Sequence, residues 1–127
     1  VVVFGATAST VAPLTLDHDV VRGLVAKLRL GVLDGSRTAI GAGLGMALNR
    51  LAESDATSKI VVLLTDGVHN ADGIDPDTAA TEAAARGVKV YTVLMGRHDF
   101  RNARATVDPK QLERIATRTQ GFAYTAQ

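Results

Sequence analysis

Residues 60–67 read IVVLLTDG, and this stretch decides the fold. Its first six residues are aliphatic or β-branched and show no alternation with polar residues. Such a run is typical of a strand that is covered on both faces, as in a parallel sheet between helices. Asp66 and Gly67 then form a strong turn signal that ends the strand.

Strand-like and helix-like segments alternate on both sides of this run. An aspartate followed by proline starts two of the helices, at Asp75 and Asp108, because proline suits the first helical position. Asp17 or Asp19 is expected to cap the first helix. We expect strands at residues 1–4, 11–16, 60–65, 88–95 and 122–125, and helices near residues 20–28, 40–53, 76–86 and 109–120.

This order predicts an α/β fold of the Rossmann-like, doubly wound type, with a mostly parallel sheet and helices on both faces. The length of 127 residues is that of one domain, residues 1–127. The chain opens directly on a strand, so we expect a domain truncated at its N-terminus. Pro13 lacks an N–H group, which predicts an edge position for the strand at 11–16.

Charge and composition exclude several classes of function. Lys and Arg total 14 against 13 Asp and Glu, and this balance gives no general field for nucleic acid or an anionic membrane. The absence of cysteine excludes disulfides, thiolate zinc sites and a cysteine nucleophile. No apolar run approaches the roughly 20 residues that span a bilayer.

Two oxygen-bearing side chains are candidate ligands of a hard cation. Asp66 follows the carboxyl end of a strand, where open α/β sheets bind ligands. Thr38 precedes a helix, and its hydroxyl could either cap that helix or ligate Mg²⁺, which prefers oxygen donors. On residue type alone, Asp66 is more commonly just a turn residue. The two residues converge only if both loops reach the same edge of the sheet.

Other patterns carry weaker signals. Gly41, Gly43 and Gly45 do not have the spacing of a phosphate-binding loop and predict close packing of a helix. Asn70 and Asp72 fall short of a calcium loop, because Val68 and Ala79 replace required acids. We interpret His69 as a solvated loop residue, and residues 97–104, which carry three arginines, as a solvated basic loop. Nothing in the sequence indicates catalysis.

Three segments together resemble the von Willebrand factor type A domain, most closely its bacterial aerotolerance (Bat-type) branch. They are Thr38-Ala39-Ile40-Gly41, residues 59–67 and residues 88–93. The resemblance covers nearly the whole chain. Leu94 and Gln120, where the branch usually or often has glycine, and His69, where it commonly has asparagine, depart from its pattern.

The resemblance implies a metal-ion-dependent adhesion site (MIDAS), in which Mg²⁺ or another divalent cation bridges to a carboxylate of a partner protein. Thr38 and Asp66 match two of its ligands. The Asp-x-Ser-x-Ser ligands lie on the family's first, central strand, which this chain lacks together with the helix after it. We therefore expect this chain alone to bind metal weakly or not at all. The resemblance also implies a bacterial parent protein anchored in the inner membrane.

The leading hypothesis is a non-enzymatic protein-binding module whose adhesion site is incomplete. The alternative is a structural or oligomerising domain with no working metal site, and an enzyme of the doubly wound class is disfavoured. Without the central strand, we expect either a homo-oligomer that fills the gap or a sheet in which residues 1–4 and 60–65 close up on each other.

Overall fold

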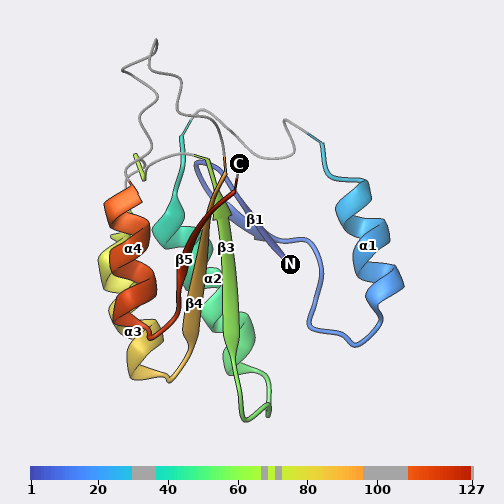
Figure 1. The fold of residues 1–127 in the computed structure, drawn as a ribbon. Helices are drawn as coiled ribbons and strands as arrows, with labels where there is room; N and C mark the ends of the chain where they lie inside the picture. Colours follow the sequence, from blue (N-terminus) through green and yellow to red (C-terminus); the bar gives the residue numbers. More distant parts are fainter. Residues whose placement is uncertain (30–36, 67–68, 71–72, 96–108, 127) are drawn as a thin grey trace.

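The computed structural model describes residues 1–29, 37–66, 69–70, 73–95 and 109–126. A three-stranded parallel sheet and a separate two-stranded hairpin both pack on a layer of helices (Figure 1). The sheet order is β3-β4-β5, so β4 is its central strand. Its strands are β3 (Ile60–Thr65), β4 (Lys89–Met95) and β5 (Ala123–Ala126).

Three helices cover one face of the sheet and enclose the core. They are α2 (Ile40–Ala52), α3 (Pro76–Ala85) and α4 (Pro109–Arg118). The largest side chains with no more than 1% exposure include Ile40, Leu44, Val90 and Ile115. Small alanines on α3 let this helix approach β4 closely, so branched aliphatic residues fill a core that has few aromatics.

The ends of α3 follow the sequence signals. Asp75 caps the helix through a hydrogen bond that its carboxylate accepts from the Asp77 N–H, 3.2 Å away. Gly87 has a φ of +70° directly after the helix, and the Val88 N–H donates to the Ala83 carbonyl. This left-handed glycine ends the helix as predicted. Asp108, the other expected cap, lies outside the described residues.

The N-terminal strands form an antiparallel hairpin of β1 (Val2–Phe4) and β2 (Ala8–Thr10). The prediction of a strand at residues 11–16 is therefore wrong. The N–H groups of Val11 and Ala12 both donate to the Val1 carbonyl, which closes the ladder at this point. Pro13 follows and offers no N–H to continue it.

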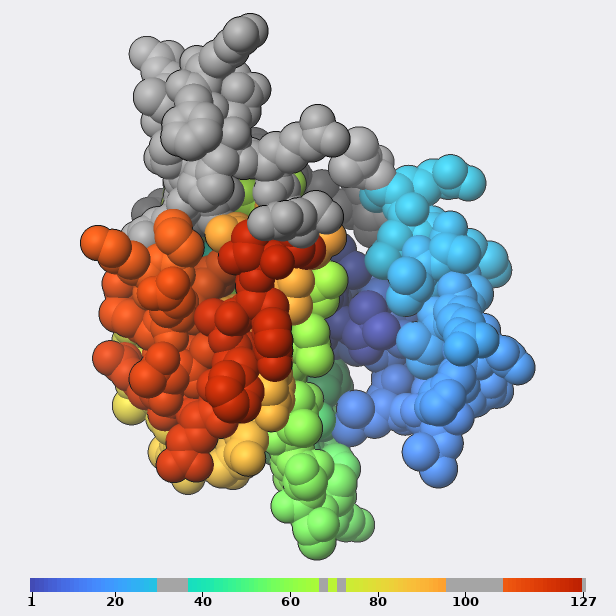
Figure 2. Space-filling model, in the orientation of Figure 1, coloured from blue at the N-terminus to red at the C-terminus, as the bar shows by residue number. Residues whose placement is uncertain are grey.

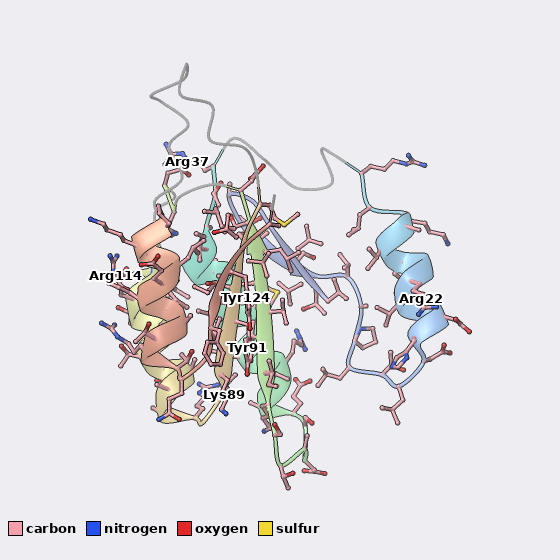
Figure 3. All side chains as sticks on the ribbon, in the orientation of Figure 1. Arg22, Arg37, Lys89, Tyr91, Arg114 and Tyr124 are labelled. Carbon is pink, nitrogen blue, oxygen red and sulfur yellow. The ribbon has the colours of Figure 1, made fainter. Side chains whose placement is uncertain are left out.

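Within the described part of the chain, one face of the sheet is left open. The exposed fraction along β3 alternates, with Leu63 at 4% and Val62 and Leu64 at 58% and 55%. The expectation that this strand is covered on both faces is wrong, because α2, α3 and α4 all pack on the same side. Tyr91 and Tyr124 continue the open face across β4 and β5 (Figure 3).

Helix α1 (His18–Ala26) lies at one side of the molecule, away from the other helices (Figure 2), and packs on no other described helix or strand. The Asp17 carboxylate caps it by accepting from the Val20 N–H at 3.2 Å, as one of the two predicted caps. None of its residues is buried, and Val20 and Val25 are 51% and 46% exposed. The apolar stripe of α1 is therefore left without a partner among the described elements.

These features confirm the α/β fold class, with a parallel sheet, four helices and a short N-terminal hairpin. The prediction that the first strand closes onto β3 is wrong. In the described part of the chain β1 pairs only with β2, and β3 pairs only with β4. Oligomerisation through this gap stays a prediction.

Candidate functional site

The start of α2 is hydrogen-bonded to the loop that follows β3. The Thr38 N–H donates to Asn70 Oδ1 over 2.6 Å, and the Asn70 N–H donates back to the Thr38 carbonyl over 3.0 Å. The Ile40 N–H donates to His69 Nδ1 over 3.1 Å. These three bonds join two segments about thirty residues apart, and the bond to His69 satisfies the Ile40 N–H, which the helix start leaves without an intrahelical partner.

The two predicted metal ligands lie in these two segments. Thr38 is half-buried and stands two residues before α2, and Asp66 is exposed and directly follows β3. Because Asn70 is close in sequence to Asp66 and bonded to Thr38, both segments are found at the carboxyl end of the sheet. Figure 1 shows the start of α2 and the arrowhead of β3 at this same, upper end.

Two oxygen donors are too few to hold Mg²⁺ by themselves. Mg²⁺ requires near-octahedral coordination and gives up its waters reluctantly. Within the residues that the structure describes, no three His, Asp or Glu side chains form a group that could hold a metal ion. Thr38 and Asp66 thus suit the chemistry of a hard cation but do not complete its coordination.

Sequence reasoning missed the role of two residues at this edge. The interpretation of His69 as a solvated loop residue is wrong, since it is half-buried and its Nδ1 accepts from the helix. Thr38 is not the helix cap either, because the N-cap position is Ala39, which has no side-chain acceptor. An alanine at the N-cap could have indicated this, because it cannot accept from the first N–H groups of the helix, which then need acceptors from another segment.

Two of the three glycines in α2 are explained by packing. A Cβ atom on Gly41 would collide with the Ile74 carbonyl, and one on Gly43 would lie 2.7 Å from the Phe4 ring. These contacts confirm that the glycines serve close approach of the helix to its neighbours. Asp72, the basic loop at residues 97–104 and His98 lie outside the described residues.

Comparison with known proteins identifies the family. The sequence matches the von Willebrand factor type A domain profile over residues 1–127. The chain belongs to the von Willebrand factor type A (VWA) family. VWA domains are typically protein-binding modules with a MIDAS and are usually non-catalytic.

Solved structures of bacterial proteins share this VWA fold. An aerotolerance-related membrane protein from Bacteroides fragilis has a TM-score of 0.81 at 21% identity, over 99% of this chain and 70% of that one. BatB from Bacteroides thetaiotaomicron has a TM-score of 0.80 at 21% identity, over 99% and 69%. These likenesses confirm the Bat-type resemblance at the level of fold.

Two longer proteins match as well. Proximal thread matrix protein 1 from the mussel byssus, in a structure with a zinc-occupied MIDAS, has a TM-score of 0.77 at 23% identity, over 99% of this chain and 30% of that one. An uncharacterized protein of Borreliella burgdorferi is 30% identical over 98% of this VWA chain, which spans 40% of its length. None of the described helices of this chain is both long and apolar enough to cross a membrane.

Proposed function

We propose that this VWA domain is a non-enzymatic module that binds a partner protein at the carboxyl end of its sheet, with Thr38 and Asp66 as ligands of a divalent cation. The cation, Mg²⁺ or a similar ion, would accept a carboxylate of the partner as a further ligand. The observation that carries the proposal is the hydrogen-bonded junction between the Thr38 turn and the loop after β3.

The junction supports the proposal because it is fixed by protein atoms alone. The Asn70 side chain accepts from the Thr38 N–H and the Asn70 N–H donates to the Thr38 carbonyl, so protein atoms alone position the Thr38 backbone. The exposed carboxylate of Asp66 leaves room for a partner. Since only two donors come from these residues, we expect weak metal binding by the chain alone and stronger binding when a partner supplies a carboxylate.

The Bat-type likeness supports a bacterial setting. The Bacteroides fragilis neighbour is described as an aerotolerance-related membrane protein. We propose that this VWA domain likewise belongs to a parent protein anchored in the bacterial inner membrane. The domain itself, residues 1–127, would then act as the part that meets the partner.

An NMR titration with MgCl₂ tests the metal-binding part of this proposal. We expect the amide signals of Thr38, Asp66 and Asn70 to shift, and the shifts to disappear in Asp66→Ala. The matched control is Asp55→Ala, because Asp55 is an exposed aspartate beyond the other end of α2. Repeating the titration with an aspartate-containing peptide should strengthen binding. Shifts that persist in Asp66→Ala, or that are lost equally in Asp55→Ala, would contradict the proposal.

The alternative function is a structural domain that self-associates without a metal site. The exposed apolar face of the sheet favours it, since contiguous apolar surface often marks an interface. Light scattering with and without MgCl₂ separates the two functions. A stable oligomer that ignores both the metal and Asp66→Ala supports the alternative, and a monomer counts against it.

A further inference from the structure

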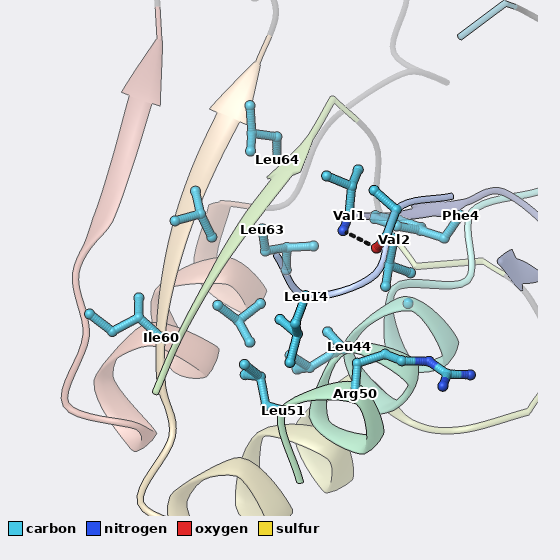
Figure 4. A pocket seen from close by; sticks show the side chains of 15 residues that line it. Val1, Val2, Phe4, Leu14, Leu44, Arg50, Leu51, Ile60, Leu63 and Leu64 are labelled. Atoms are coloured by element: carbon cyan, nitrogen blue, oxygen red, sulfur yellow. Dashed lines mark hydrogen bonds between the residues drawn. The ribbon is translucent and has the colours of Figure 1, made fainter. Parts of the chain in front are cut away.

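Arg50 and His69 differ in how many of their polar atoms are engaged within the chain. Arg50 borders the apolar groove between β1 and β3 (Figure 4), and its guanidinium donates to Thr10 Oγ1 over 3.1 Å and to Glu53 Oε1 over 3.4 Å. That cation is therefore used inside the chain. In His69, at the carboxyl-end junction, Nδ1 accepts from the Ile40 N–H over 3.1 Å, and Nε2 makes no hydrogen bond to a described residue.

The bond to Ile40 fixes where the ring of His69 carries its proton. A ring nitrogen that accepts a hydrogen bond cannot itself be protonated, so Nδ1 is bare and the N–H group of the neutral ring is at Nε2. A doubly protonated ring has donors at both nitrogens and could not make this bond. The start of α2 therefore selects one tautomer of His69 and leaves its single donor at Nε2.

The Nε2–H group of His69 is accessible to a partner. In the described part of the chain, no buried side-chain nitrogen or oxygen lacks a hydrogen-bond partner. Since Nε2 has no such partner and His69 is only half-buried, this atom reaches solvent. The ring also belongs to the junction, because the adjacent Asn70 exchanges two hydrogen bonds with Thr38.

We propose that His69 is a contact residue for the partner protein, and that its Nε2–H donates to an acidic side chain of that partner. This inference rests on the proposed function, which brings a carboxylate of the partner to the same junction. A carboxylate has two acceptor oxygens, so one of them can accept from His69 while the other is bound elsewhere.

The same donor gives the junction a preference among partner side chains. A hydrogen bond to a charged acceptor is stronger than one between two neutral groups. A neutral N–H donor therefore favours an aspartate or glutamate of the partner over asparagine or glutamine. His69 thus acts as a specificity-determining residue through an atom of this chain, in addition to any contact that a cation provides.

Two substitutions separate the acceptor of His69 from its donor. The Oδ1 atom of asparagine is the same number of bonds from Cβ as Nδ1, so His69→Asn keeps an acceptor for the Ile40 N–H and loses the donor at the Nε2 position. The amide of glutamine is as far from Cβ as Nε2, so His69→Gln keeps a donor and loses the acceptor. The Ile40 amide signal reports whether the acceptor is in place.

Calorimetric titration of the full chain with an aspartate-containing peptide tests the inference. MgCl₂ is present throughout, because it offsets the negative charge of Asp66. We expect His69→Asn to weaken peptide binding at least about fivefold, the size of effect that loss of one charge-assisted hydrogen bond produces. The urea midpoint and the shifts that Mg²⁺ alone causes at Thr38 and Asp66 should stay as in the wild type.

Two controls distinguish a partner contact from a structural role. His18→Asn makes the same change at an exposed histidine at the start of α1 and should leave peptide binding unchanged. A peptide with asparagine in place of aspartate should bind the wild type more weakly and bind His69→Asn about equally. In the wild type, the NMR signals of the ring should show the proton at Nε2, and the Nε2–H signal should move when the aspartate peptide is added.

Three results would overturn the inference: equal binding of the aspartate peptide by the wild type and His69→Asn, a proton at Nδ1, or an Nε2–H signal that the peptide does not move. The last two use the wild type, so they decide even if a variant does not fold. Mg²⁺ shifts that survive such a result leave the proposed metal site intact. Peptide binding through His69 without any Mg²⁺ shifts would refute the metal site and support this contact.

Discussion

The two sides of β3 behave as different kinds of surface. Toward the helices, Leu63 packs into a core where Val90 and Ile115 are fully buried. In the described part of this closed side, no buried side-chain nitrogen or oxygen lacks a hydrogen-bond partner. Toward the hairpin and the open face, the same strand presents exposed aliphatic side chains and an edge that no described strand pairs.

The difference teaches that the described helices cover only one of the two faces of the sheet. On the closed side every contact is made within the chain, so stability resides there. On the open side the side chains of the described residues are largely exposed, so substitutions there are expected to cost little stability. Thr92 is an example on the closed side: its Oγ1 donates to the Leu112 carbonyl over 3.3 Å, between β4 and α4.

The largest effect is expected from truncating the closed side. Ile115→Ala should lower the free energy of unfolding by about 2–5 kcal/mol, because it leaves a cavity in a fully buried site. Val62→Ala on the open face should cost less than about 1 kcal/mol, since this side chain is mostly in water already. Urea denaturation of the two variants measures both values. Equal losses would show that the open face is covered in solution.

A pair of glycine substitutions sharpens the comparison between packed and unpacked helices. Gly41→Ala should cost about 1–3 kcal/mol, because the added methyl group meets the Ile74 carbonyl and the backbone must shift. Gly23→Ala in α1 meets no atom within 4 Å and should raise local helicity without lowering the free energy of unfolding. Circular dichroism and urea melts test both. A destabilising Gly23→Ala would mean that α1 packs on something.

The junction at the carboxyl end should show an intermediate effect. Asn70→Ala removes the acceptor of the Thr38 N–H and should cost about 1–2 kcal/mol. Asn70→Asp keeps an oxygen acceptor at the same place and should recover most of the loss. Chemical denaturation, with the Thr38 amide signal as a local probe, measures the pair. If both variants lose the same free energy of unfolding, this hydrogen bond does not stabilise the turn.

The smallest effect concerns the end of α4. Gln120 has a φ of +62°, a left-handed conformation that favours glycine. Gln120→Gly should raise the free energy of unfolding by up to about 1 kcal/mol, whereas Gln120→Ala should not raise it. Thermal denaturation of both variants measures these changes in stability. If Gln120→Ala also raises the free energy of unfolding, the glutamine side chain, and not the left-handed backbone, is destabilising.

Local signals predicted most of the elements. The unbroken apolar run at residues 60–65, the Asp75-Pro76 start and the Gly87 stop each act within a few residues, and each was correct. The predicted strand at residues 11–16 is wrong. The strand is Ala8–Thr10 instead, since the tight turn after Phe4 sets the hairpin register.

Long-range features could not be predicted from the chain alone. Nothing in the run from Ile60 to Thr65 shows that one face stays open, because a strand covered on both faces has the same composition. The bonds from His69 and Asn70 to the start of α2 join residues about thirty positions apart, so no local pattern marks them. Family resemblance indicated Thr38 and Asp66 as a pair, and their joint role in metal binding stays a prediction.

Native-state hydrogen exchange along β3 and β4 tests the central claim most directly. β4 lies between two strands, so its amides that face either neighbour should be protected nearly to the level of global unfolding. Along Ile60–Leu64, protection should alternate, with the amides directed away from β4 exchanging much faster than those directed toward it. Uniform strong protection along both strands would contradict the claim that this side of the sheet is open.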